Sequence, residues 1–306
     1  MSYAIVVPTY NPGSEWGAWV EAVVRQTVKP EVVIVIDSSS TDGQIGSCEP
    51  SAWQIVKIKS VEFDHGGTRN MGFEMAAQHQ VDYVVSLTQD SILSDNHSIE
   101  RLLEPFADAQ VAAVCGRQLP RADANARARF ARLFNYPEVS RVNAMADIRG
   151  RGIKTAFMSN SFAAYRLGAY MSEGGFESPI IFGEDMQLAA RLILKGWRTV
   201  YCSEAETVHS HNNSLKDDFQ RYFDMGVFHR QMPALFECFG TATGEGFSFL
   251  AGEIKYVWRN NIFELPMVFL EIFTKFTAHQ CGLNYAKIPN GLRRRLSLNK
   301  KYWMHG

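Results

Sequence analysis

The first half of the chain alternates short runs of β-branched and apolar residues with segments of helical spacing. The runs are YAIVVPTY from Tyr3, EVVIVID from Glu31 and VDYVVSL from Val81, and EWGAWVEAVVRQ and TRNMGFEMAAQH stand between them. Strands buried on both faces read as continuous apolar runs, and helices that cross between parallel strands separate them. The pattern predicts an α/β fold with a doubly wound, mostly parallel sheet. In such sheets ligands bind beyond the carboxyl ends of the strands.

Further runs continue the pattern to about residue 214. VAAVCGRQ from Val111 and TAFMSNSFAAYR from Thr155 read as extended, and GEDMQLAARLILKGWRTVY reads as a helix followed by a strand. The basic segment from Arg121 to Pro137 is compatible with a helix or a mobile loop. Strand signals fade after about Leu215, where DDFQRYFDMGVFHRQM and EIKYVWRNNIF have helical spacing. We expect an α/β domain over residues 1–214 and a helical C-terminal region over residues 215–306.

The composition excludes several classes of protein. The 306 residues are 46% hydrophobic and 21% charged with a formal net charge of -1, so nothing global attracts nucleic acid. Five scattered cysteines without a CxxC pair indicate neither a disulfide framework nor a zinc-thiolate site, which fits a reducing cytoplasm. The N-terminus lacks a signal-peptide layout, and Glu264, Pro266 and Glu271 interrupt the longest apolar stretch. We predict no transmembrane helix.

Three polar residues near predicted strand ends are candidate metal ligands. Asp90 follows VDYVVSL, and His209 and His211 flank one residue after the predicted strand near Tyr201. Asp90 either caps the next loop or binds a divalent cation, because Mg²⁺ and Mn²⁺ prefer carboxylate oxygen and often take few protein ligands beside substrate phosphates. For the histidines, a structural role and a ligand role both stay open.

Two other groups are candidate nucleotide contacts. Asp37 ends VVIVID and precedes SSSTD, where it either forms a turn or accepts a hydrogen bond from the imide N–H of a pyrimidine. Arg69 and Asn70 follow two glycines at the start of a predicted helix. They either cap that helix or contact a diphosphate or ribose, for which arginine supplies a planar fork.

Glu184 and Asp185 lie in the first turn of the helix predicted from GEDMQL. Carboxylates there are stabilised by the helix dipole, which is sufficient reason for their presence. The alternative is a general base directed into a pocket. Their spacing alone does not choose between the two.

Taken in order, these motifs resemble glycosyltransferase family 2, whose members have the GT-A fold, over about residues 3–211. VVPTYN resembles the first-strand signature, Arg69 and Asn70 match the RN element, TQD ending at Asp90 takes the place of the metal-binding DxD, and GED matches the base motif. Thr88 replaces the first Asp of DxD, and Ser38 stands where a second Asp is common. The nucleotide-sugar contacts that the resemblance implies are Pro8, Thr9, Asn11, Asp37, Arg69, Asn70 and Gln89.

More narrowly, VIDSSSTDG, HGGTRN, TQDS and HSHN resemble the bacterial rhamnosyltransferase branch, which uses dTDP-L-rhamnose to build surface polysaccharides such as O-antigen or capsule. The resemblance implies inverting transfer, with Asp185, beside Glu184, taking a proton from the acceptor hydroxyl. Asp90, His209 and His211 with Mg²⁺ or Mn²⁺ would offset charge on the leaving diphosphate. Another UDP- or GDP-sugar, a sugar nucleotidyltransferase and a non-catalytic sugar-nucleotide binder remain alternatives.

The C-terminal region combines aromatic and basic residues. Residues 247–276 are rich in Phe, Trp, Leu and Ile, and NGLRRRLSLNKKYW follows them. Either the aromatic residues pack the helical region beneath a solvated basic face, or both meet an anionic membrane surface. With a glycan or lipid-linked acceptor, we expect a cytoplasmic protein attached peripherally to the inner face of the cell membrane.

Overall fold

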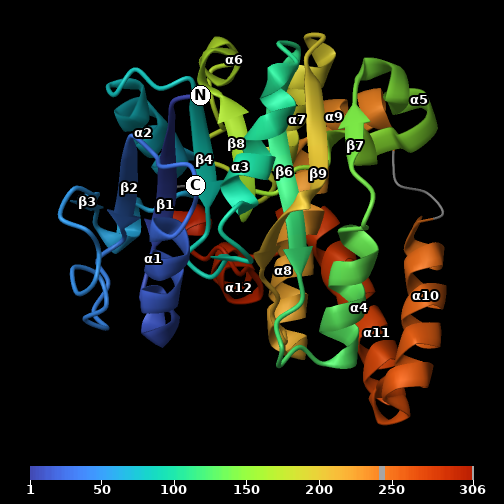
Figure 1. Cartoon of the computed structure of the whole chain (residues 1–306). Helices are drawn as coiled ribbons and strands as arrows, with labels where there is room; N and C mark the ends of the chain where they lie inside the picture. Colours follow the sequence, from blue (N-terminus) through green and yellow to red (C-terminus); the bar gives the residue numbers. More distant parts are fainter. Residues whose placement is uncertain (241–244, 305–306) are drawn as a thin grey trace.

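A single mixed sheet organises the chain, and the computed structural model describes residues 1–240 and 245–304. The strand order is β3-β2-β1-β4-β8-β6-β9-β5, and β7 also pairs with β9 (Figure 1). The strands are β1 (Tyr3–Thr9), β2 (Val32–Asp37), β3 (Gln54–Lys57), β4 (Tyr83–Leu87), β5 (Ile92–Leu93), β6 (Val111–Leu119), β7 (Arg141–Asn143), β8 (Phe162–Arg166) and β9 (Arg198–Val208).

Most strands of this sheet point the same way. β3, β2, β1 and β4 are mutually parallel, and β6 is parallel to β9. β8 runs antiparallel between β4 and β6, and β5 and β7 are antiparallel to β9. The mostly parallel α/β sheet predicted from the sequence is therefore confirmed, with β8 as an inserted antiparallel strand.

The extended run predicted over residues 155–166 is only partly a strand. Its first residues end a 3₁₀ helix, η5 (Gly152–Ala156), and only Phe162–Arg166 pairs as β8. The residues between them turn, because the backbone N–H of Asn160 bonds to Asp185 Oδ2 at 3.0 Å and its side chain bonds to Glu184. Tertiary contacts thus override the local β propensity here.

Helices cover both faces of the sheet. A hydrophobic core lies on each face of the sheet, and successive β1 residues point alternately into one or the other. Tyr3, Ile5 and Val7 face α1 (Trp16–Val24) and α3 (Ser98–Leu103). Ala4 and Val6 face the opposite side. On that side lie α2 (His65–Ala77), α6 (Leu167–Ser172) and α7 (Glu184–Leu194). A Cβ at Gly72 would lie 2.4 Å from Val6 Cγ1, so α2 can pack this closely only with glycine there.

The basic segment that the sequence left open is a helix, α4 (Ala126–Asn135). The Asn125 side chain caps it by accepting a hydrogen bond from the Ala128 N–H at 2.8 Å. Phe130 and Phe134 pack against Phe249 of α10 (Glu245–Asn260), with ring centroids 5.2 and 5.1 Å from that of Phe249. Beyond α4 and β7 the chain forms the short helix α5 (Ile148–Arg151).

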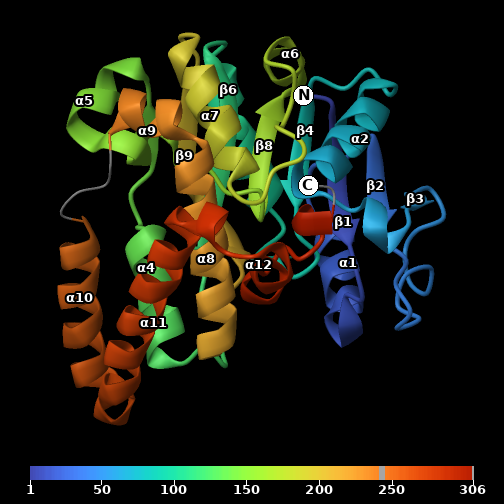
Figure 2. The same cartoon turned by 180° about the vertical axis from the view of Figure 1, so that it is seen from behind.

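The C-terminal helices are α8 (Leu215–Gln231), α9 (Pro233–Phe239), α10 (Glu245–Asn260), α11 (Leu265–Leu283) and α12 (Asn290–Leu296). α8 and α11 cross at two glycines: a Cβ on Gly226 would lie 2.9 Å from Gly282 Cα. α12 lies beside α8 near the middle of the molecule, whereas α10 and α11 form its edge (Figures 1 and 2).

These helices share a core with the sheet domain, because Ile180 and Ile181 cluster with Phe223, Phe228 and Trp303. The division at residue 214 stays a prediction. The other 3₁₀ helices are η1 (Gly13–Glu15), η2 (Ser60–Glu62), η3 (Glu104–Ala107), η4 (Met145–Asp147), η6 (Ile262–Glu264), η7 (Tyr285–Lys287) and η8 (Tyr302–Met304). Within residues 1–240 and 245–304, every helix is too short or too polar to cross a bilayer.

Candidate active site

A cavity of about 620 Å³ lies at the carboxyl ends of the parallel strands, where α/β sheets bind their ligands. Arg69 enters it from α2, Asp90 from the end of β4, Glu184 and Asp185 from the start of α7, and His209 and His211 from the end of β9. The structure thus brings together six of the residues that the sequence singled out.

Asp90, His209 and His211 form a compact cluster. Asp90 Oδ2 lies 3.4 Å from His209 Nε2 and 3.2 Å from His211 Nε2, and the two imidazole nitrogens are 3.1 Å apart. One ligand atom from each residue lies within 4.8 Å of the others. Because a carboxylate oxygen and two imidazole nitrogens converge on one point, the donor set fits a divalent cation.

Neighbouring groups set the orientation and the pKa values of the residues in this cluster. His209 Nδ1 and Gln118 Oε1 are 2.9 Å apart, and this contact orients the ring with Nε2 toward Asp90. Burial lowers the pKa of His209, and Asp90 only partly offsets this, so the ring is neutral. Burial alone raises the pKa of Asp90, but hydrogen bonds from both histidines outweigh it and hold that pKa well below its usual range.

Asp185 has the properties of a general base. Its carboxylate accepts hydrogen bonds from the N–H groups of Asn160, at 3.0 Å, and of Met186, at 2.7 Å. Burial and then the negative charge of Glu184 raise the pKa of Asp185 to about 7. A carboxylate with a pKa near neutrality can both accept a proton and release it again at working pH.

Glu184 has a different environment from Asp185. It is 7% exposed, and its Oε1 accepts hydrogen bonds from Arg69 Nη1 and Asn160 Nδ2, each at 3.1 Å. Burial raises the pKa of Glu184, but Arg69 and then His65 more than offset this. Glu184 is therefore held ionised as the partner of Arg69. Arg69 Nη1 donates hydrogen bonds to Glu184 and, at 2.9 Å, to the His65 carbonyl oxygen. The sequence did not predict this pairing.

The residues predicted at the ends of β1, β2 and β4 form a hydrogen-bonded frame behind the cavity. Gln89 bonds to both backbone groups of Tyr10, with its Oε1 2.7 Å from the Tyr10 N. Asn11 forms hydrogen bonds with Ser40 and Thr41. Asp37, which is 1% exposed, accepts hydrogen bonds from Thr9 and Ser40. Pro8 lies in β1 directly before Thr9. Tyr10 and Ser38 from this frame line the cavity.

Asn70 supports the fold beside the cavity. Its Nδ2 donates to the Phe176 carbonyl at 2.9 Å, and its Oδ1 accepts from the Phe176 N–H at 2.9 Å and from the Tyr170 hydroxyl. These bonds occupy both acceptor positions of the oxygen and one of the two amide hydrogens, and Asn70 is not among the residues that line the cavity. The geometry favours the structural interpretation of this residue.

The sequence analysis did not identify four cationic residues of the cavity wall as site residues. They are Arg132, Arg221, Lys300 and Lys301. Arg132 comes from α4, whose asparagine cap was the signal that could have identified a helix there. Burial lowers the pKa of Arg132, and its Nη1 donates to Gln118 Oε1 beside His209. These residues concentrate positive charge around the cavity.

Lys300 and Lys301 belong to the C-terminal basic run that the sequence linked to a membrane. Lys301 Nζ bonds to Ser60 Oγ at 2.9 Å and lies 5.8 Å from the Tyr10 ring centroid. Asp224 fixes this segment by accepting hydrogen bonds from the N–H groups of Leu298 and Asn299, at 3.0 and 2.9 Å. The end of the chain therefore forms part of the active-site wall.

Comparisons with known proteins agree with this geometry. Residues 2–223 match the model of the family described as "Glycosyltransferase like family 2". The chain is 44% identical over 303 residues to the O-antigen chain rhamnosyltransferase WbaN of Salmonella anatum, covering 99% of this chain and 96% of that protein. It is 43% identical over 304 residues to RfbN of Salmonella typhimurium, of the same description, with the same coverage.

Solved structures with a similar fold are more distant in sequence. The mannosyltransferase PcManGT from Pyrobaculum calidifontis, in complex with GDP-Man and Mn²⁺, has a TM-score of 0.54 at 18% identity over 99% of this chain and 84% of its own. The S. aureus TarS fragment 1–349 with UDP-GlcNAc has a TM-score of 0.53 at 13% identity, covering 99% and 85%. These likenesses concern the fold.

Proposed function

Since the chain belongs to the glycosyltransferase family 2-like family and has the GT-A fold, we propose that it transfers L-rhamnose from dTDP-L-rhamnose to a lipid-linked glycan in O-antigen synthesis. That it is a glycosyltransferase follows from the family and from its near-full-length relatives. The donor, the acceptor and the cytoplasmic location are the proposed part. The description "O-antigen chain rhamnosyltransferase" that both relatives carry supports the donor sugar and the kind of acceptor.

The proposed reaction is an inverting displacement. An acceptor hydroxyl attacks the anomeric carbon of rhamnose from the face opposite the diphosphate, a new C–O bond forms, and the bond to the diphosphate oxygen breaks. Asp185 takes the hydroxyl proton, and dTDP leaves. The observation that carries this mechanism is that Asp185 and the cluster of Asp90, His209 and His211 line the same cavity. Holding both reactants in one site can itself lower the barrier by several kcal/mol.

A divalent cation held by Asp90, His209 and His211 would offset the charge that develops on the leaving diphosphate. Arg132, Arg221 and Lys300 face the same cavity and add fixed positive charge around it. Arg69 acts indirectly, since it keeps Glu184 ionised. Its own positive charge lowers the pKa of Asp185, but burial and Glu184 outweigh it.

The test is a panel of dTDP-, UDP- and GDP-sugars, with and without Mn²⁺ or Mg²⁺ and with a lipid-linked glycan fraction as acceptor. Thermal stabilisation reports binding of the donor, and released nucleotide reports transfer. We expect dTDP-rhamnose alone to support acceptor-dependent release. Equal release from a UDP- or GDP-sugar would refute the donor assignment.

We also propose peripheral membrane attachment through the outward face of α10, η6 and α11, named the hairpin face. The inner side of the hairpin buries two carboxylates beside apolar residues such as Val257 and Val268: Glu253 and Glu271 are 3% and 5% exposed, and Glu271 pairs with Arg127. Its outer side carries large apolar residues, namely Trp258, Ile262, Phe263, Phe269, Phe273 and Phe276, of which Phe263 is 91% exposed. An apolar surface of this kind on a soluble domain marks a contact with a membrane or a protein.

Liposome flotation tests this attachment. We expect Phe263→Ser/Phe273→Ser to lose binding to vesicles that contain anionic lipid, because those rings no longer enter the acyl boundary. Met171→Ser, at an apolar residue 49% exposed on α6, is the matched control and should still float. Equal flotation of both variants would argue against the hairpin face as the anchor.

A further inference from the structure

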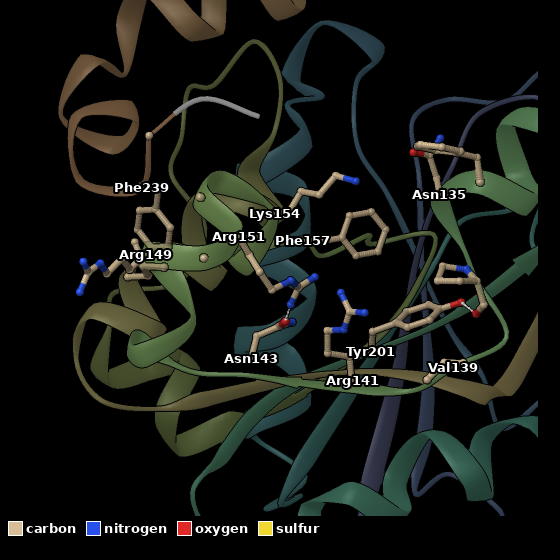
Figure 3. Close-up of a pocket in the computed structure, with 16 residues that line it drawn as sticks. Asn135, Val139, Arg141, Asn143, Arg149, Arg151, Lys154, Phe157, Tyr201 and Phe239 are labelled. Atoms are coloured by element: carbon tan, nitrogen blue, oxygen red, sulfur yellow. Dashed lines mark hydrogen bonds between the residues drawn. The ribbon is translucent and has the colours of Figure 1, made fainter. Parts of the chain in front are cut away.

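A second cavity, of about 740 Å³, lies between the end of α4, β7 and α5. Arg141, Arg149, Arg151 and Lys154 line it, and none of its described lining residues is Asp or Glu. Figure 3 shows the side chains of Arg141, Arg151 and Lys154 gathered on one side and that of Arg149 extending the opposite way. We call this space the cationic cavity.

Two arginines of the cationic cavity lack a carboxylate partner among the described residues. Within residues 1–240 and 245–304, Arg141 and Arg151 have no carboxylate within ion-pair distance, and Arg151 donates a hydrogen bond to the neutral Asn143 amide. Burial, and after it the positive charge of Arg141, lower the pKa of Arg151, and the negative charge of Asp147 only partly offsets them. Burial and then both arginines lower the pKa of Lys154. Like charges held together in this way are stabilised by an anion.

A third cavity lies between the cationic cavity and the active site. This cavity, of about 500 Å³, shares Arg132, Tyr136 and His211 with the active-site cavity. At its other end it shares Asn135 and Phe157 with the cationic cavity. Its lining is mixed, with Asn213, Lys275 and the carboxylates of Asp218, Glu253 and Glu271 beside Phe249 and Tyr222. The three cavities therefore follow one another along α4, from Asp185 to the arginines.

We propose that the cationic cavity binds a phosphate or diphosphate group of the acceptor, while the reacting hydroxyl of the same acceptor lies beside Asp185. This assignment rests on the proposed transferase function. The guanidinium groups of Arg141 and Arg151 can each donate two hydrogen bonds to the paired oxygens of a phosphate. The hydrogen-bonded frame at the ends of β1 and β2, where the sequence resemblance implies nucleotide contacts, is separated from α4 by the middle of the sheet (Figure 1), which leaves the α4 side to the acceptor.

Inorganic pyrophosphate is the probe. The full chain is first saturated with dTDP and excess Mg²⁺ to occupy the donor site, and pyrophosphate is then titrated in a calorimeter. The variants are Arg141→Gln and Arg141→Gln/Arg151→Gln, with Arg149→Gln as the matched control that removes the arginine pointing away. The single variant guards against misfolding, because Arg141 is exposed at the surface.

We expect the wild type and Arg149→Gln to bind one pyrophosphate in addition to the bound dTDP. Its affinity should fall by about 10-fold or more in the double variant, since two charge-assisted hydrogen-bond donors are lost. The KM for a lipid-linked acceptor fraction should rise in parallel while kcat stays unchanged. Absence of the site in the wild type, or equal loss in Arg149→Gln, would overturn the proposal.

A lipid headgroup is the other source of such a phosphate, and vesicles distinguish it. If the double variant loses binding to phosphatidylglycerol vesicles but keeps the acceptor KM, the cavity serves the membrane and the acceptor assignment is overturned. Failure of the proposed function looks different. In that case the wild type releases no nucleotide from dTDP-rhamnose, yet its pyrophosphate site still depends on Arg141.

Discussion

Arg69 and Glu184 form a buried ion pair although 115 positions separate them in the chain, with Nη1 3.1 Å from Oε1. Their side chains are only 5% and 9% exposed. Asn160 donates a second hydrogen bond to the same Glu184 oxygen. The pair therefore joins α2, α7 and the turn before β8 beside Asp185.

Removing one member of this pair should destabilise the protein. Glu184→Ala leaves the Arg69 guanidinium buried without a counter-charge, which costs about 3–5 kcal/mol of unfolding free energy. Urea unfolding measures the change. Glu177→Ala, at an exposed glutamate nearby, is the control and should stay within about 0.5 kcal/mol of the wild type. Equal stability of the two variants would show that the pair contributes little.

The pH dependence of transfer should report Asp185. Its pKa is raised to about 7 by burial and by Glu184, and the base acts only when deprotonated. The value of kcat/KM should therefore rise as pH increases through about 7 and level off above it. Initial rates between pH 5.5 and 9 with dTDP-rhamnose measure this profile. A profile that is flat across that range would assign proton transfer to another group.

Cation dependence should follow the donor set of Asp90, His209 and His211. Chelation with EDTA should lower transfer, and Mn²⁺ should restore it at lower concentration than Mg²⁺, because imidazole nitrogen binds transition metals better than Mg²⁺. Gln118→Leu removes the partner that orients His209 and should raise the Mn²⁺ requirement about 10–100-fold. Gln110→Leu, at an exposed position, is the control. Full activity in EDTA would contradict a catalytic cation.

The C-terminal segment should affect donor binding. Asp224→Ala removes the acceptor that fixes Leu298 and Asn299, so Lys300 and Lys301 lose their positions in the cavity wall. The KM for the nucleotide-sugar should rise several-fold. Asp224→Asn keeps one side-chain carbonyl oxygen for these N–H groups and should change KM less. Identical KM values in wild type and Asp224→Ala would remove the segment from the donor site.

The sheet and the cluster of Asp90, His209 and His211 could be predicted from the sequence because both depend on local pattern. Buried parallel strands such as β1 and β4 read as uninterrupted apolar runs, and polar residues that follow them must meet at one sheet edge. This rule identified Asp90, His209 and His211 as neighbours although His209 is 119 positions from Asp90 in the chain.

The rest of the site depends on long-range packing that no spacing encodes. Arg69 matched a nucleotide-binding pattern, yet its side chain pairs with Glu184, since a buried guanidinium needs a counter-charge. Lys301 read as part of a membrane-facing basic run but lies against Tyr10 at the opposite end of the chain. The sequence of the segment that contains Arg132 is compatible with a helix or a loop. The helix packs against α10, and this long-range contact cannot be read from residue spacing.

The most direct test of the proposed mechanism compares Asp185→Asn with the wild type in transfer from dTDP-rhamnose and in dTDP binding. The amide keeps the shape of the side chain but cannot accept the acceptor proton, so turnover should fall by about 10²–10⁴-fold. The dissociation constant for dTDP with Mn²⁺ should stay within about twofold, because the cation ligands are untouched. Turnover near the wild-type rate in Asp185→Asn would contradict the assignment of Asp185 as the base.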